Sequence, residues 1–272
     1  MTSTSVQGPG RVGVRLPSGG NRPGAGTRTR EHRAAAVAAG ILYITGTVAG
    51  VAGMTVTNSV RAAADPLAAA AQHPGVLVTG ALLVLVMGLS LALVPVVLFP
   101  VLRKADEVLA VGYLVVRGAV ETLCYCVLAI GLLLALPVGE ILASGSGTAS
   151  SAGVRVGSIL MDAEAANAVL ALVFLLGAAL FYVLLYRSRI VPRWIAGWGL
   201  AAIPFYLAAT VLAMYSVIDA NSSTQTMLFM PLAVQEMVLA GWMIGRGFRP
   251  AVGAATSGHV SARVESPQPA SV

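Results

Sequence analysis

The hydrophobic positions of this chain are gathered into six long segments, which alternate with shorter polar stretches. Each segment is near or above the roughly 20 residues that an α-helix needs to cross about 30 Å of hydrocarbon. The segments span residues 34–57, 76–101, 110–136, 160–186, 194–217 and 227–247. The pattern therefore predicts an all-α protein, a polytopic membrane bundle of six transmembrane helices.

The two ends of the chain lack this pattern. Residues 1–33 are rich in Gly, Pro, Ser, Thr and Arg, and residues 250–272 show no apolar periodicity either. Neither stretch offers enough apolar surface to offset the entropy of ordering, so we expect two disordered tails around one membrane domain, residues 34–249. The first apolar run starts at Ala34 and is longer than the apolar region of a signal peptide, so we interpret it as the first span.

The overall composition supports a lipid environment. Hydrophobic residues make up 57% of the chain and charged residues 10%, whereas soluble domains have roughly 45–50% and 25%. A water-soluble fold of this length would need far more polar surface. The lipid bilayer is therefore the expected partner of the outer helix faces.

The basic residues are distributed unevenly between the two predicted sides. The tails and connections on the side of both termini contain 14 Lys and Arg residues, whereas the opposite side has only Arg61 and Arg155. Because cytoplasmic connections carry the excess of Lys and Arg, we expect both termini in the cytoplasm. Trp194, Trp198 and Trp242 fall near the predicted cytoplasmic ends, where indole rings favour the interface. The net charge of +6 is spread between spans and forms no single patch, so no nucleic-acid partner is expected.

Two pairs of glycines have the spacing that lets helices approach closely. Gly46 and Gly50 lie four residues apart in the first segment, and Gly241 and Gly245 have the same spacing in the last. Such pairs allow backbone contact between neighbouring helices. Such pairs are common by chance in glycine-rich membrane chains, so each is weak evidence for a particular helix contact.

Three stretches carry a family resemblance. They are Arg117-Gly-Ala-Val-Glu121, Tyr186-Arg-Ser-Arg-Ile-Val-Pro-Arg-Trp194, and Pro231 through Phe248 (PLAVQEMVLAGWMIGRGF). Together, in this order, they resemble the bacterial integral membrane family catalogued as domain of unknown function 4386. The resemblance covers residues 34–249. It implies a six-span protein of the bacterial plasma membrane and supplies no reaction.

Ionisable side chains within a span are candidates for function, because inserting Arg or Asp at a helix centre costs about 2.5–3.5 kcal/mol. Arg117 and Glu121 lie at i and i+4 of the third segment and share a helix face. They form either structural contacts between helices, with Arg117 extending toward the cytoplasmic interface, or a binding or transport site. Glu236, near the middle of the sixth segment, is either a neutral carboxyl group bonded to a neighbouring helix or a proton-binding carboxylate of a carrier.

Polar residues also open the fourth segment. Glu164 and Asn167 are three residues apart and could face the bundle together, which makes them further candidates for ligand or ion binding. Asp162 is better explained as an acid at the wet start of a helix, where the helix dipole favours negative charge.

No enzyme signature is evident. His32, His73 and His259 lie outside the spans, and the chain has no phosphate-binding loop, zinc-type Cys pattern or nucleophile motif. We therefore expect no metal, no cofactor and no catalytic residue. The first hypothesis is a non-enzymatic membrane protein that binds a lipid, a small apolar molecule or a partner protein. The alternative is a secondary transporter or proton-coupled carrier that uses Arg117, Glu121 and Glu236.

Overall fold

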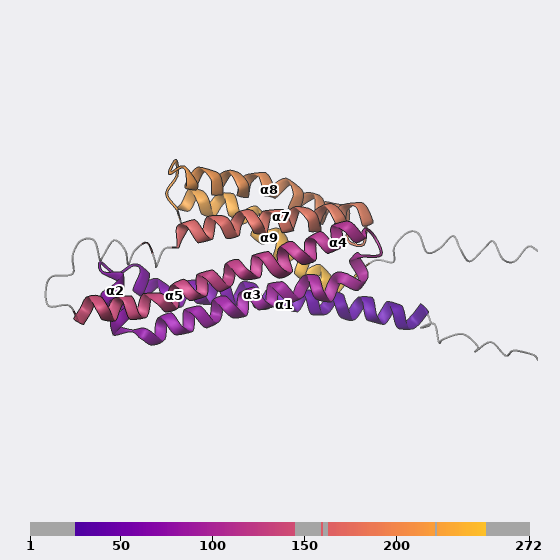
Figure 1. The fold of residues 1–272 in the computed structure, drawn as a ribbon. Helices are drawn as coiled ribbons and strands as arrows, with labels where there is room; N and C mark the ends of the chain where they lie inside the picture. The colour runs from indigo at the N-terminus through magenta and orange to yellow at the C-terminus, as the bar shows by residue number, and fades with distance from the viewer. Residues whose placement is uncertain (1–24, 145–158, 160–162, 221, 249–272) are drawn as a thin grey trace, which may run out of the picture.

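The computed structural model describes residues 25–144, 159, 163–220 and 222–248, and the regular elements in these residues are all helical (Figure 1). Six helices are long and apolar enough to cross a membrane, which confirms the predicted all-α bundle of six spans. The elements are α1 (Ala25–Arg61), α2 (Pro66–Gln72), α3 (Pro74–Leu102), α4 (Glu107–Tyr113), η1 (Leu114–Val120), α5 (Glu121–Ser144), α7 (Glu164–Ser188), α8 (Arg193–Met214) and α9 (Ser223–Gly245). The third span is a continuous run of α4, η1 and α5.

The helices differ from the sequence prediction at the start of α1, in the first connection and at the end of α5, which continues to Ser144 instead of ending near residue 136. Helix α1 begins at Ala25, so residues 25–33, expected to be disordered, are helical. The first connection contains the short helix α2, which is capped by the carboxylate of Asp65 and starts with Pro66. The rest of the predicted tails, residues 1–24 and 250–272, lies outside the described residues.

By chain order the spans divide into a first and a second group of three, and their contacts close a ring because α1 also meets α9. In the first group α1 packs on α3 and α3 packs on α5, and in the second group α7 packs on α8 and α8 packs on α9. The two groups meet where α1 contacts α9 and where α7 contacts α4, η1 and α5. We call them the N-terminal half and the C-terminal half.

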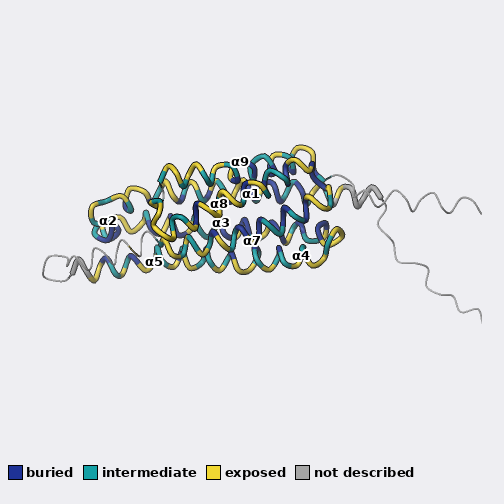
Figure 2. The backbone as a smooth tube through the Cα atoms, turned by 90° about the horizontal axis from the view of Figure 1, so that it is seen from above, coloured by how far each residue is buried: buried dark blue, intermediate teal, exposed yellow. Residues whose placement is uncertain are grey.

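The outer surface of the bundle is apolar. Exposed positions follow the outward helix faces, whereas buried positions lie between the helices (Figure 2). Large exposed side chains include Val48, Met54, Leu89, Leu123 and Phe205, each more than half exposed. Since lipid tails are as apolar as these side chains, the surface fits a bilayer. This is a multi-pass membrane protein.

Basic side chains collect at one end of the bundle. There Arg33 Nη2 donates to the Gly245 carbonyl oxygen over 3.5 Å, which brings the start of α1 to the end of α9. Lys104 Nζ lies 3.1 Å from His32 Nε2 in the same region. Among the described Lys and Arg residues, only Arg61 lies at the opposite end, at the close of α1. We call the first end the basic end; the described start of α1 and the end of α9 both lie there.

The two glycine pairs behave differently. A Cβ atom added to Gly46 would lie 3.0 Å from the Leu91 side chain, and one on Gly50 would lie 2.5 Å from Met87 Sδ, so this pair packs on α3. A Cβ atom on Gly241 or Gly245 would have no neighbour within 4 Å. The second pair therefore makes no close helix contact with the described residues. The close approach of α1 to α9 depends instead on Gly40.

Replacing Gly40 with alanine should lower the free energy of unfolding by about 1 kcal/mol. The new Cβ atom would lie 2.8 Å from the Ala240 carbonyl oxygen and 2.6 Å from Ile244 Cγ1. The strain of overpacking, about 1–3 kcal/mol, is partly offset by about 1 kcal/mol of gained helix propensity. Thermal unfolding in detergent measures the change. Gly241→Ala is the matched control and should be neutral or slightly stabilising; equal loss in both variants would argue against a steric cause.

Candidate functional site

Arg117 lies in η1, a π-helical segment in the first half of the third span. Segments of this type are rare and occur frequently at functional sites, because the extra residue per turn changes the direction of nearby side chains. Arg117 follows Glu107, the first residue of the span, by ten positions. At about 1.5 Å per residue it lies about 15 Å from the basic end, near the middle of the hydrocarbon.

Two carboxylates approach the Arg117 guanidinium. Its Nη1 atom is 3.6 Å from Glu121 Oε2, and its Nη2 atom is 3.6 Å from Glu236 Oε1. Glu121 belongs to the same span, whereas Glu236 comes from α9 in the C-terminal half. The side chains of Arg117 and Glu121 are each 1% exposed, and that of Glu236 is 16% exposed. We call these three residues the ion cluster; it lies at the junction of the two halves.

Aromatic rings cover the guanidinium. Its Cζ atom lies 5.4 Å from the ring centre of Tyr43 on α1 and 5.0 Å from that of Phe174 on α7. Both distances allow favourable cation–π attraction, which is stronger when the cation is desolvated. Two more rings continue from Phe174, since Tyr206 lies 5.5 Å from it and stacks on Phe229 at 3.9 Å. The cluster is thus enclosed by side chains from both halves.

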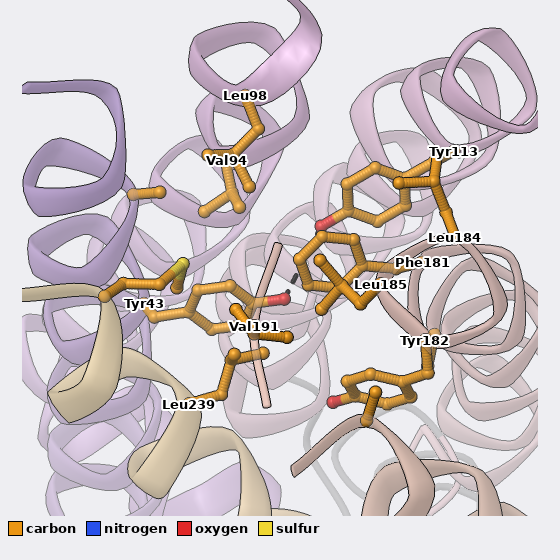
Figure 3. Packing of buried hydrophobic residues seen from close by; sticks show 14 of the residues in the cluster. Tyr43, Val94, Leu98, Tyr113, Phe181, Tyr182, Leu184, Leu185, Val191 and Leu239 are labelled. Atoms are coloured by element: carbon orange, nitrogen blue, oxygen red, sulfur yellow. Dashed lines mark hydrogen bonds between the residues drawn. The ribbon is translucent and has the colours of Figure 1, made fainter. Parts of the chain in front are cut away.

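Tyrosine hydroxyls surround the same region. Tyr125 donates a hydrogen bond of 3.3 Å to Glu121 Oε1. The hydroxyls of Tyr43 and Tyr113 face each other at 3.5 Å, and Tyr113 stacks on Phe181 (Figure 3). The buried hydroxyl of Tyr182 forms no hydrogen bond with a described residue. Proton donors and acceptors therefore extend from the cluster toward α4 and α7.

The ion cluster keeps unused hydrogen-bonding capacity. Within the described part of the chain, Arg117 Nε and Nη2, Glu121 Oε2 and Glu236 Oε1 are buried and make no hydrogen bond. The ion-pair distances of 3.6 Å are too long to count as hydrogen bonds. A buried polar atom left unsatisfied costs about 1–3 kcal/mol, so such atoms call for a partner. Donors and acceptors together suit a small polar ligand, water or a proton.

The charges of the cluster do not balance when both carboxylates are ionised. One guanidinium then faces two carboxylates, which gives the cluster a net charge of −1. An uncompensated charge in a low-dielectric interior is strongly unfavourable. The arrangement therefore favours uptake of one proton or one cation.

A family model described as a domain of unknown function, DUF4386, matches residues 38–247. The chain belongs to this family. The match contains the whole ion cluster and its aromatic enclosure, and it bears out the resemblance found in the sequence. No curated protein and no solved structure matches the chain.

The structure of this DUF4386 protein places the candidate residues in two groups. Arg117, Glu121 and Glu236 converge, and the buried guanidinium shows that Arg117 does not extend to the interface. Glu164 and Asn167 lie at the start of α7 and are both exposed, so the expectation that they face the bundle is wrong. Asp162 lies outside the described residues.

The sequence pattern did not indicate several residues that surround the ion cluster. Tyr43, Phe174 and Tyr125 are aromatic residues within apolar spans of a DUF4386 chain, where they have the same pattern as ordinary packing residues. Gln235, next to Glu236, donates a hydrogen bond of 3.0 Å from Nε2 to the Ile195 carbonyl oxygen and so ties α9 to α8. In the sequence, only the ionisable residues within the spans indicated this region.

Proposed function

We propose that this DUF4386 protein is a non-enzymatic, proton-coupled secondary carrier of the bacterial plasma membrane, and that the ion cluster binds the coupling proton. One observation carries the proposal: carboxylates from both halves lie 3.6 Å from a single buried guanidinium. By helix length this guanidinium is about 15 Å from the basic end, which corresponds to about half of the hydrocarbon thickness. Carriers place their coupling-ion sites at this depth, between two structural halves that move relative to each other.

The difference in exposure supports Glu236, rather than Glu121, as the residue that takes up the proton. Glu121 is 1% exposed and accepts a hydrogen bond from Tyr125, so it remains the permanent partner of Arg117. Glu236 is 16% exposed and belongs to the other half. A proton on Glu236 removes its charge attraction to Arg117 and weakens the link between halves. Proton binding is thereby coupled to their relative movement.

The basic end is assigned to the cytoplasm in this proposal. Lys and Arg gather there, at the described start of α1 and the end of α9. The positive-inside tendency of membrane proteins then orients both termini toward the cytoplasm.

A second function is favoured by the tight enclosure of the guanidinium. Tyr43 and Phe174 cover Arg117, which is 1% exposed, as in a packed contact between helices. In that case the cluster only holds the halves together. The protein would then bind a lipid, a small apolar molecule or a partner protein elsewhere, without transport.

The two functions predict different results for Glu236→Gln. Vesicles that contain the purified protein and a trapped pH-sensitive dye report proton movement when solutes from a panel of sugars, amino acids and organic cations are added. We expect the wild type to move protons with at least one solute and Glu236→Gln to lose this movement, because glutamine keeps the shape of the side chain without binding a proton.

Glu140→Gln is the control for this experiment. Glu140 is an exposed residue of α5, remote from the cluster, so its replacement removes one acid and should leave proton movement unchanged. Solute-driven proton movement in Glu236→Gln at the wild-type rate would reject the role of this residue. A wild type that moves no protons with any solute, while Glu236→Gln remains folded, would favour the second function.

A further inference from the structure

A hollow of about 450 Å³ opens at the basic end of the bundle, beside the turn between α7 and α8. Its lining consists of Arg189, Val191, Pro192, Arg193, Trp194 and Trp242. The first five belong to the Y-R-S-R-I-V-P-R-W motif, and Trp242 comes from α9. The hollow shares no residue with the ion cluster. Its lining contains two guanidinium groups and no acid.

The turn that carries the two arginines is firmly anchored. Helix α7 ends where Arg189 adopts a left-handed conformation with φ of +57°, and its N–H donates to the Leu185 carbonyl oxygen. Ile190 and Val191 are then buried at 5% and 0% exposure, and α8 begins at Arg193. The hydrophobic pair fixes the turn to the core. The arginines on either side of it are left exposed.

The residue at the left-handed position is unusual. Helices commonly end with glycine or asparagine in this conformation, since other L-residues pay a steric cost of about 1–2 kcal/mol. Arg189 adopts this conformation in spite of the steric cost, and its side chain lines the hollow. Neither Arg189 nor Arg193 forms an ion pair with a described residue. Arg193 instead rests on the Tyr186 ring, 5.1 Å from its centre.

The chemistry of these residues suits an anion. Guanidinium groups bind phosphate oxygens through paired charge-assisted hydrogen bonds. The first turn of α8, at Pro192 and Arg193, adds the positive end of a helix of 22 residues. Trp194 is 56% exposed and lies 6.5 Å from Trp198, as expected of rings at the interface between headgroups and acyl chains.

We infer that this hollow binds the phosphate headgroup of an anionic phospholipid. The two arginines hold the phosphate, and the exposed faces of Trp194 and Tyr186 contact the glycerol and upper acyl region of the same lipid. A lipid is favoured over free phosphate because apolar exposed rings border the site on the side of the bilayer. The inference is independent of proton coupling at the ion cluster.

Native mass spectrometry of the full chain in detergent, titrated with phosphatidylglycerol or phosphatidylcholine, tests the inference. The variant is Arg189→Gly with Arg193→Gln, since glycine fits the left-handed backbone at position 189 and keeps the turn folded. We expect it to bind phosphatidylglycerol about tenfold more weakly than the wild type, because two charges near the lipid phosphate are lost. Binding of phosphatidylcholine should be weak in both.

The matched control is Arg103→Gln with Lys104→Gln, which removes two charges from the same end but outside the hollow. It should retain binding of phosphatidylglycerol. Equal loss in both double variants would show a diffuse charge effect and overturn the site. Displacement of the lipid by millimolar inorganic phosphate would show a free-phosphate site instead. Unchanged binding in the Arg189 and Arg193 variant, with an unchanged unfolding temperature, would also reject the inference.

Discussion

Replacement of Arg117 by methionine is expected to lower the free energy of unfolding in detergent by about 3–5 kcal/mol, the loss typical of breaking a buried ion pair. Without the guanidinium, Glu121 and Glu236 are left as buried acids with no cation beside them. The rings of Tyr43 and Phe174 also lose the cation that they cover. Thermal unfolding, followed by the helical circular dichroism signal, measures the loss.

A triple variant of the ion cluster tests whether the lost stability comes from unpaired charges or from lost packing. Arg117→Met combined with Glu121→Gln and Glu236→Gln removes every charge of the ion cluster while keeping similar side-chain volumes. Replacing a buried ionic group by neutral residues is often neutral or stabilising, so most of the lost stability should return. Arg103→Met is the control, because Arg103 is exposed at the end of α3 and surface changes are usually within about 0.5 kcal/mol.

Two results would contradict this account. If Arg117→Met unfolds at the wild-type temperature, the guanidinium does not hold the halves together. If the triple variant is no more stable than Arg117→Met, the loss comes from packing and not from unpaired carboxylates. A stable triple variant that no longer moves protons would assign the cluster to function and not to folding.

Gly88→Leu is expected to destabilise the N-terminal half by about 1–3 kcal/mol through overpacking. Gly88 lies on α3 against Tyr125, and an added Cβ atom would come within 2.7 Å of Tyr125 Cβ and 2.9 Å of its Cγ. These atoms are close to the α5 backbone and cannot swing aside as the end of a flexible side chain does. Tyr125, the hydrogen-bond donor to Glu121, is therefore displaced together with its helix.

Thermal unfolding and proton movement in vesicles are both informative for Gly88→Leu. We expect a lower unfolding temperature and weaker proton movement, because Glu121 loses its donor. Gly75→Leu on the same helix is the matched control: Gly75 is exposed and a Cβ atom there meets nothing within 4 Å. A loss of equal size in Gly75→Leu would mean that the leucine, and not the contact with Tyr125, is responsible.

The ion cluster and the proposed lipid site at the α7–α8 turn share no residue and have separate proposed roles. The cluster, near mid-membrane, contains charges from both halves and is suited to coupling a proton to their movement. The arginines of the α7–α8 turn lie at the basic end and are suited to holding the C-terminal half against the lipid surface. Variants at one site should leave the readout of the other unchanged, since no residue is shared.

The sequence by itself determined the features that depend on near neighbours along the chain. Six apolar segments became six helices because span length and hydropathy are local properties. The pairing of Arg117 with Glu121 was also predictable, since residues four apart share a face of one helix. The spacing of two glycines four residues apart is also visible in the sequence. It does not determine a helix contact, because Gly46 and Gly50 contact α3 whereas Gly241 and Gly245 have no neighbour within 4 Å.

Tertiary structure decided which helices meet and how each is rotated. Glu236 reaches Arg117 across 119 positions of sequence, and no local pattern indicates that α9 turns this residue toward the third span. The sequence also does not show how each helix is rotated about its own axis. That rotation leaves Glu164 and Asn167 exposed and places the rings of Tyr43 and Phe174 over the Arg117 guanidinium. In apolar spans the hydrophobic pattern is nearly uniform around the helix, so it does not distinguish lipid-facing from buried faces. Only side-chain packing between helices makes that distinction.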